Sequence, residues 1–210
     1  MLSFRQALCA VTLTAGLALS GASQAGPIPY PNGGTENTTL YSFTAASTGK
    51  VTAYFYARSF AGYTNQIGMW VNGVSTGIYG LNNQTSNPGD EIDLGNVVAG
   101  DEIVFEMINL SPGGVGPWYS KKSMNVDGTN HVYSTDFSGM LGTKSVTGTY
   151  VGFEDLDART GTDYNYTDEQ FVFTNIATRT NVPEPGTLAL VLIAGAAAVG
   201  RRRRTAAVTH

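Results

Sequence analysis

The chain has 210 residues, 26 of them glycine, and a formal net charge of −4. Between residues 26 and 181 the balance is more acidic, with 15 Asp and Glu against 7 Lys and Arg. Such a charge disfavours nucleic acids and anionic membranes as partners and favours cations. The single cysteine, Cys9, lies outside that region, which excludes disulfides, zinc–thiolate sites and a cysteine nucleophile within it.

The first 25 residues have the order of a secretory signal peptide. Arg5 is followed by an apolar run over residues 7–19 and then by small residues that end at Ala25. This succession of charged, apolar and small residues predicts export, with cleavage after Ala25. Signal peptidase and the general export machinery are therefore expected partners.

Short apolar segments separated by Gly, Asn and Asp turns fill the middle of the chain. The patterns predict strands at residues 50–58, 67–79, 91–98, 102–110, 131–137, 149–153 and 170–176. Asn72-Gly73 divides the second segment into a hairpin, because both residues tolerate positive φ. Residues 99–101 are predicted to be the turn that joins the next two segments as a strand pair. No segment carries a sustained apolar stripe of helical period.

These features predict an all-β fold, an antiparallel β-sandwich that is jelly-roll-like. Roughly 156 residues between the two ends suffice for a single core. The expected organisation is a signal peptide, a leader segment, the β-sandwich domain, a linker and a C-terminal signal, at residues 1–25, 26–39, 40–176, 177–181 and 182–210.

Six acidic residues and one base, Arg159, lie within the sequence EDLDARTGTDYNYTDE, residues 154–169. Carboxylates held this close repel one another, and Ca²⁺ relieves the repulsion by binding 6–8 oxygen ligands. The sequence predicts a calcium site with ligands drawn from Glu154, Asp155, Asp157, Asp163, Asn165 and Asp168. The spacing is not that of an EF-hand. The alternative is that these side chains only form turns by accepting hydrogen bonds from backbone amides.

Sugar binding is an alternative function. Trp118 and Tyr119 follow a loop rich in Gly and Pro, residues 111–117, and an exposed ring there would stack on an exopolysaccharide. The other interpretation is that the tryptophan packs into the end of the sandwich, and Trp70 is assigned to the core.

Enzymatic activity is not expected. His131 is the single histidine between residues 26 and 181, and no serine lies in a Gly-x-Ser-x-Gly elbow. A glycosidase would have to draw its two carboxylates from the acidic stretch, where they are crowded and lack an apolar pocket that raises one pKa.

The C-terminal segment combines a short motif, an apolar run and a basic cluster. The motif is Val182, Pro183, Glu184 and Pro185. The apolar run, residues 188–200, predicts a single hydrophobic helix, although a bilayer core needs about 20 residues. The cluster that follows is expected to stay on the cytoplasmic side and consists of Arg201, Arg202, Arg203 and Arg204.

This arrangement resembles the PEP-CTERM sorting signal of Gram-negative bacteria. The resemblance implies recognition by an exosortase, a membrane cysteine transpeptidase that cleaves near the Pro-Glu-Pro. Transient insertion into the inner membrane would precede release or transfer to the cell surface or extracellular matrix. The six residues 205–210 after the basic cluster depart from the common form.

The acidic stretch resembles a domain of unknown function found in exported bacterial surface proteins. Its signature is Gly-Phe-Glu-Asp-Leu, then Asp-x-Asp-Tyr-Asn-Asp before a Val-Phe strand. Residues 152–156 match the first half, and Asp163, Tyr166 and Asp168 match the second, while Asn165 and Thr167 replace Asp and Asn. The resemblance implies a non-catalytic surface or matrix protein with a calcium site.

Overall fold

The computed structural model describes residues 28–58 and 61–181. The predicted signal peptide and the C-terminal segment 182–210, with its predicted helix, lie outside these residues. The two described ranges contain eleven β-strands and one short 3-10 helix, η1 (Lys122–Met124). No helix within them is long and apolar enough to cross a membrane.

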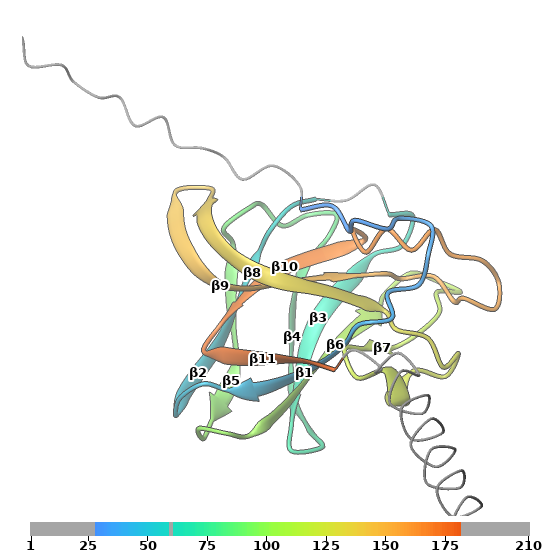
Figure 1. Cartoon of the computed structure of the whole chain (residues 1–210). Coiled ribbons are helices and arrows are strands. Elements are labelled where there is room, and N and C mark those ends of the chain that lie inside the picture. The colour runs from blue at the N-terminus through green and yellow to red at the C-terminus, as the bar shows by residue number, and fades with distance from the viewer. Residues whose placement is uncertain (1–27, 59–60, 182–210) are drawn as a thin grey trace, which may run out of the picture.

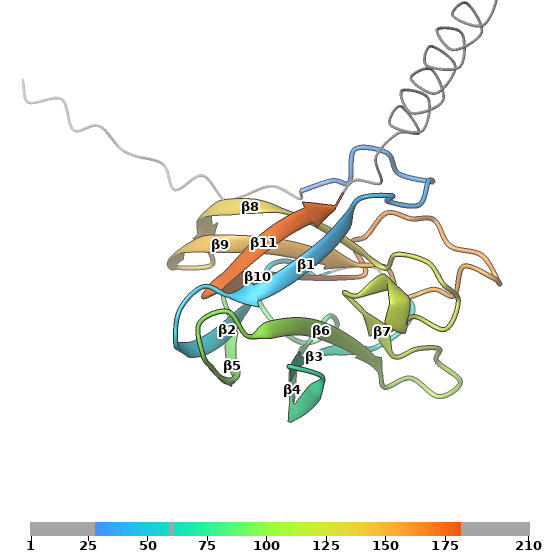
Figure 2. The same ribbon diagram turned by 60° about the horizontal axis from the view of Figure 1, so that its bottom comes forward.

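The strands form two antiparallel sheets (Figure 1 and Figure 2). The six-stranded sheet has the order β11-β1-β6-β3-β4, with β7 paired to β6. Its strands are β1 (Leu40–Ala45), β3 (Asn65–Val71), β4 (Val74–Asn82), β6 (Glu102–Asn109), β7 (Trp118–Tyr119) and β11 (Ile176–Asn181). The five-stranded sheet has the order β5-β2-β10-β9-β8. Its strands are β2 (Gly49–Phe55), β5 (Glu91–Val97), β8 (Val132–Leu141), β9 (Lys144–Phe153) and β10 (Glu169–Thr174). The prediction of an all-β fold with antiparallel strands is confirmed.

One apolar core lies between the two sheets. Side chains alternate between the two faces of a strand, so every second residue of β6 and of β10 faces the other sheet. The ring of Phe173 on β10 stacks on that of Phe105 on β6, with centroids 3.7 Å apart. Burying a side chain of this size contributes about 1.5–3 kcal/mol. Apolar contact between the facing strands therefore holds the sheets together.

The strands predicted as a pair at residues 91–98 and 102–110 lie in different sheets. β5 pairs with β2, whereas β6 pairs with β1 and β3. The turn between them is closed by Asp101, whose Oδ2 accepts a hydrogen bond from Val98 N at 2.7 Å. Gly100 N donates to the Ala45 carbonyl and Ala45 N donates to the Asp101 carbonyl, each at 2.9 Å, and these two hydrogen bonds fix the turn against the end of β1. The prediction that these two segments form a strand pair is wrong, because the turn carries the chain from one sheet to the other.

Residues 177–181, predicted to be a linker, belong to β11, which pairs along the whole of β1. The prediction failed because the sequence of residues 177–181, Ala-Thr-Arg-Thr-Asn, shows no apolar alternation.

The predicted leader, residues 26–39, packs on the domain through Asn37. Asn37 donates from its backbone N to the Tyr166 hydroxyl and from Nδ2 to the Val132 carbonyl, at 2.8 and 3.0 Å.

The loop between β9 and β10, residues 154–168, begins and ends at one end of the core. Asp168 N donates a hydrogen bond to the carbonyl of Phe153 at 3.0 Å. The antiparallel pairing thus brings the first residues of the loop, Glu154 and Asp155, beside its last. Figure 1 shows this loop in orange at the end of the molecule where β7 lies.

Candidate metal centre

Three buried carboxylates meet where this loop begins and ends. Glu154, Asp155 and Asp168 each place a carboxylate oxygen within 4.8 Å of the other two. They are 1%, 3% and 9% exposed. Asp155 N donates to Asp168 Oδ2 at 3.0 Å, which fixes the two ends of the loop to each other. We refer to these three residues as the outer carboxylate group.

Burial and mutual repulsion disfavour the charged form of this group. Burial, followed by the charges of Asp155 and Glu154, raises the pKa of Asp168 to about 9. Burial raises the pKa of Glu154 to about 7, and that of Asp155 is raised for the same reason. Within the described part of the chain, neither Glu154 nor Asp155 forms an ion pair with a Lys or Arg. A bound cation would supply the missing positive charge.

Several buried oxygens at this end of the core have no hydrogen-bond partner among the residues described. They are Oε2 of Glu154, Oδ1 of Asn65 and both carboxylate oxygens of Glu169. A buried acceptor without a donor costs about 1–3 kcal/mol. Ca²⁺ binds 6–8 oxygens, including carboxylates and amide carbonyls, so these atoms fit the chemistry of a calcium shell.

Two further predicted ligands, Asp163 and Asn165, line the hollow in front of the outer carboxylate group. The hollow has a volume of about 490 Å³ and is lined by Asp155, Asp163, Asn165 and Asp168, among others. Asp163 is exposed and its carboxylate accepts from the backbone N and from Nδ2 of Asn165, at 3.1 and 2.7 Å. Asn165 Oδ1 in turn accepts from Thr167 N at 2.7 Å. These two side chains form turns, as the alternative interpretation expects, while lying at the entrance to the site.

Asp157 is not brought into the group. Its Oδ1 accepts from the backbone N and from Nε of Arg159, both at 2.9 Å, and its Oδ2 accepts from the guanidinium as well. This hydrogen bonding lowers the pKa of Asp157. The prediction of Asp157 as a metal ligand is therefore wrong in this structure, because the one base of the loop occupies its carboxylate.

Sequence reasoning missed two buried residues beside the candidate site, Glu169 and Asn65. Glu169 is in phase with Phe171 and Phe173 along β10, so strand alternation alone would have turned it toward the core. The same alternation applies to Asn65, which lies two residues before the buried Ile67 and therefore faces the same side of its strand. No pattern in the sequence shows that the starts of these two strands meet beside the acidic loop. The structure shows it, because Asn65 Nδ2 donates to Asp155 Oδ2 and Asn65 N donates to Asn83, whose Nδ2 donates to the Asp168 carbonyl.

Trp118 lies behind the outer carboxylate group. It is 1% exposed, its Nε1 donates to the Asp155 carbonyl at 2.9 Å, and its ring stacks on His131 with centroids 3.9 Å apart. His131 Nδ1 donates to the Glu154 carbonyl at 2.8 Å. The prediction of Trp118 as an exposed sugar platform is wrong, and the alternative that it packs into the end of the core is confirmed.

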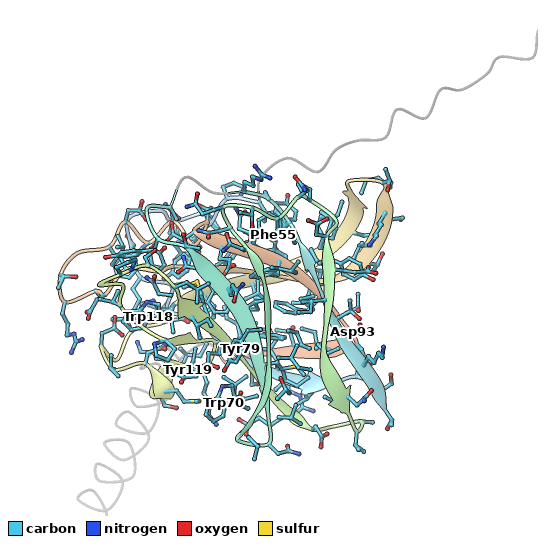
Figure 3. The ribbon with its side chains drawn as sticks, turned by 180° about the vertical axis from the view of Figure 1, so that it is seen from behind. Phe55, Trp70, Tyr79, Asp93, Trp118 and Tyr119 are labelled. Atoms are coloured by element: carbon cyan, nitrogen blue, oxygen red, sulfur yellow. The ribbon has the colours of Figure 1, made fainter. Side chains whose placement is uncertain are left out.

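Tyr119 points the other way, to the outer face of the six-stranded sheet. It pairs with Glu106, whose Oε2 accepts hydrogen bonds from Trp70 Nε1 and the Tyr79 hydroxyl, each at 2.7 Å. The rings of Trp70 and Tyr119 meet edge to face, with centroids 6.0 Å apart. We call Trp70, Tyr79, Glu106 and Tyr119 the outer aromatic cluster; Figure 3 labels its three rings. The assignment of Trp70 to the core is wrong, because its strand turns it outward.

Comparison with known families identifies the C-terminal signal. Residues 181–204 match the family model described as the PEP-CTERM protein-sorting motif. The match spans Val182 to Pro185 and the four arginines 201–204, which confirms the resemblance seen in the sequence. No curated protein and no solved structure matches the chain.

Proposed function

We propose that this chain is a non-catalytic surface or extracellular-matrix protein whose domain, a jelly-roll-like β-sandwich, is held closed by calcium. The sorting motif identifies it as an exosortase substrate exported to the cell envelope or surface. In the proposed route the signal peptide is removed after Ala25 during export. The apolar run 188–200 then holds the chain transiently in the inner membrane, with Arg201 to Arg204 on the cytoplasmic side, until exosortase cleaves near the Pro-Glu-Pro.

The outer carboxylate group is the observation that carries the calcium proposal. Three carboxylates within 4.8 Å of one another are buried, and two of them have no basic partner among the described residues. All the donor atoms are oxygens, which suits a hard cation rather than a transition metal. Asp163, at the entrance to the hollow, is placed to add a further carboxylate.

Bound calcium would join the end of β9 to the start of β10 across the loop 154–168. A ligand that binds only the folded state stabilises it by RT ln(1 + [L]/Kd), about 2.7 kcal/mol at a hundredfold excess over Kd. For a chain of this size, that free energy corresponds to a rise in Tm of roughly 5–10 °C. No disulfide can stabilise the domain in place of calcium, because the single cysteine, Cys9, lies in the predicted signal peptide.

The test is a thermal melt of the exported chain in EDTA, in 1 mM CaCl₂ and in 1 mM MgCl₂. We expect calcium to raise Tm by several degrees and Asp168→Asn to abolish the rise. Asp157→Asn is the matched control, because Asp157 lies in the same loop but its carboxylate is held by Arg159. Equal Tm in EDTA and calcium would leave the carboxylates as turn-formers and refute the proposal.

Sugar binding at the outer aromatic cluster is the second candidate function. Two of its three rings donate to Glu106, and this fixes them on the outer face of the sheet. Aromatic rings held at fixed angles can stack on the faces of sugar rings. In affinity electrophoresis with the producing cell's exopolysaccharide, Trp70→Ala should remove the retardation. Tyr54→Ala, a half-buried tyrosine of the other sheet, should leave it unchanged.

A further inference from the structure

A carboxylate lies where the core would be expected to hold an apolar side chain. Along β10, Phe171 and Phe173 face the other sheet, and Glu169 continues this series on the same face of the strand. Glu169 is 0% exposed, and neither of its carboxylate oxygens has a hydrogen-bond partner among the described residues. Burial, and secondly the charge of Asp155, raises its pKa well above the usual range. The side chain therefore lacks the neighbour that its ionised form needs.

An amide from the facing sheet, that of Asn65, reaches Asp155. Asn65 begins β3, is 0% exposed, and shares its inward face with the core residue Ile67. Its Nδ2 donates to Asp155 Oδ2 at 2.7 Å, while its Oδ1 has no partner among the residues described. The backbone N of Asn65 donates to Asn83 Oδ1 at 2.9 Å, which anchors the start of the strand.

Asp155 connects these two residues to the outer carboxylate group. It belongs to that group, it accepts a hydrogen bond from Asn65 Nδ2, and its charge adds to the rise in the pKa of Glu169. Glu169 itself is not one of the three residues whose oxygens lie within 4.8 Å of one another. One cation in the outer group would therefore leave Glu169 and the amide oxygen of Asn65 without a partner.

The number of buried carboxylates also indicates that one cation is not enough. Glu154, Asp155, Asp168 and Glu169 are four buried carboxylates, and one Ca²⁺ neutralises only two of them. Three oxygens on the inner side, two from Glu169 and one from Asn65, are unpartnered within the described chain. Oxygen ligands that include a carboxylate and an amide carbonyl are those that calcium takes.

We propose that a second calcium ion binds on the inner side of the outer carboxylate group, between Asp155, Glu169 and the Oδ1 of Asn65. This inference rests on the proposed outer calcium site, with which the inner ion shares Asp155. The inner ion links β10 of the five-stranded sheet to β3 of the six-stranded sheet. Calcium then ties the two sheets to each other, in addition to closing the loop 154–168.

The experiment is the stoichiometry of ⁴⁵Ca²⁺ binding to the exported chain by equilibrium dialysis. We expect two ions per chain for the unmodified protein and one for Glu169→Leu. One ion for both proteins would overturn the inner site and leave the outer one standing. One ion for the unmodified protein and none for Glu169→Leu would overturn the two-ion arrangement in favour of a single shared site. No ion in either would overturn both proposals.

Thermal melts of the same variant supply a second, independent readout. In EDTA, Glu169→Leu removes a buried, unpartnered carboxyl group and should raise Tm. In calcium, the variant should gain less from the ion than the unmodified protein does, because one of the two ions is lost. A neutral buried acid with no role in binding would instead give the same change in Tm in both buffers. Glu169→Gln, which keeps the shape of the side chain, replaces the leucine variant if that variant does not fold.

Discussion

Nε1 of Trp118 donates a hydrogen bond to the backbone carbonyl of Asp155, 2.9 Å away, from a fully buried position. The residue that the sequence suggested as a sugar platform is thus a support for the candidate metal centre. Its ring stacks on His131, which in turn donates to the Glu154 carbonyl. Two neighbouring backbone carbonyls of the acidic loop are therefore held by one stacked pair of aromatic side chains.

This contact predicts that Trp118 reports calcium binding. The chain has two tryptophans, so Trp70→Phe leaves Trp118 as the sole indole. In that variant, titration with calcium should change the emission, because the ion neutralises carboxylates next to the hydrogen-bonded carbonyl. The reverse variant, Trp118→Phe, should give a constant signal from Trp70 and should bind calcium several-fold more weakly. An unchanged emission from Trp118 at saturating calcium would contradict the arrangement.

Gly152 is predicted to control the position of the acidic loop. A Cβ at this residue would lie 2.1 Å from the carbonyl oxygen of Tyr166, a backbone atom that cannot move without displacing the chain. Gly152→Ala should therefore destabilise the domain by about 1–3 kcal/mol and lower its calcium affinity. Urea unfolding with and without calcium measures both effects. Gly62→Ala is the control beside the same hollow, since a Cβ there meets no atom within 4 Å.

The stability that Asp127 contributes should depend on pH. Although burial opposes it, hydrogen bonds from Thr129 N, His131 and Ala158 N lower the pKa of Asp127 to about 2. Because this value lies below that of an unfolded aspartate, about 3.9, the contribution is complete above pH 4 and is lost as pH falls toward 2. Asp127→Asn should cost about 1–3 kcal/mol at pH 6 and almost nothing near pH 2. Urea unfolding at pH 6, 4 and 2.5 checks this; a cost that does not vary with pH would contradict it.

The sequence predicted the strands of the centre of the chain and the loop that holds the acids, because both depend on local patterns. Alternation located β6 and β10, and the crowding of carboxylates pointed to residues 154–168. For the acidic residues, the sequence was compatible both with binding a metal and with forming turns. The structure assigns some of them to a buried group and others to turns and ion pairs. Glu154, Asp155 and Asp168 converge, whereas Asp157 is held by Arg159.

Pairings between distant segments could not be predicted in this way. β11 has no apolar alternation and exists because β1 offers an edge for it. The roles of Asn65 and Glu169 depend on which strands face each other across the core, a property of the whole topology. Trp70 was misassigned to the core, and Trp118 was left between two interpretations, for a related reason: the sequence does not say which side of a sheet is the inside.

The outer aromatic cluster depends on a second glycine, which allows its role to be tested apart from calcium. A Cβ at Gly68 would lie 2.4 Å from Cε1 of Tyr79. The tyrosine ring therefore occupies the space that a side chain at residue 68 would fill. Gly68→Ala should push the ring away and break its hydrogen bond to Glu106. We expect reduced retention on exopolysaccharide, a loss of stability of about 1–3 kcal/mol and an unchanged rise in Tm with calcium. Gly80→Ala is the control on the neighbouring strand, where a Cβ would meet no backbone atom and only the end of the Ile92 side chain, which can change rotamer. If Gly68→Ala keeps full retention while Tyr79 is displaced, the cluster is a structural feature of the outer face and does not bind sugar.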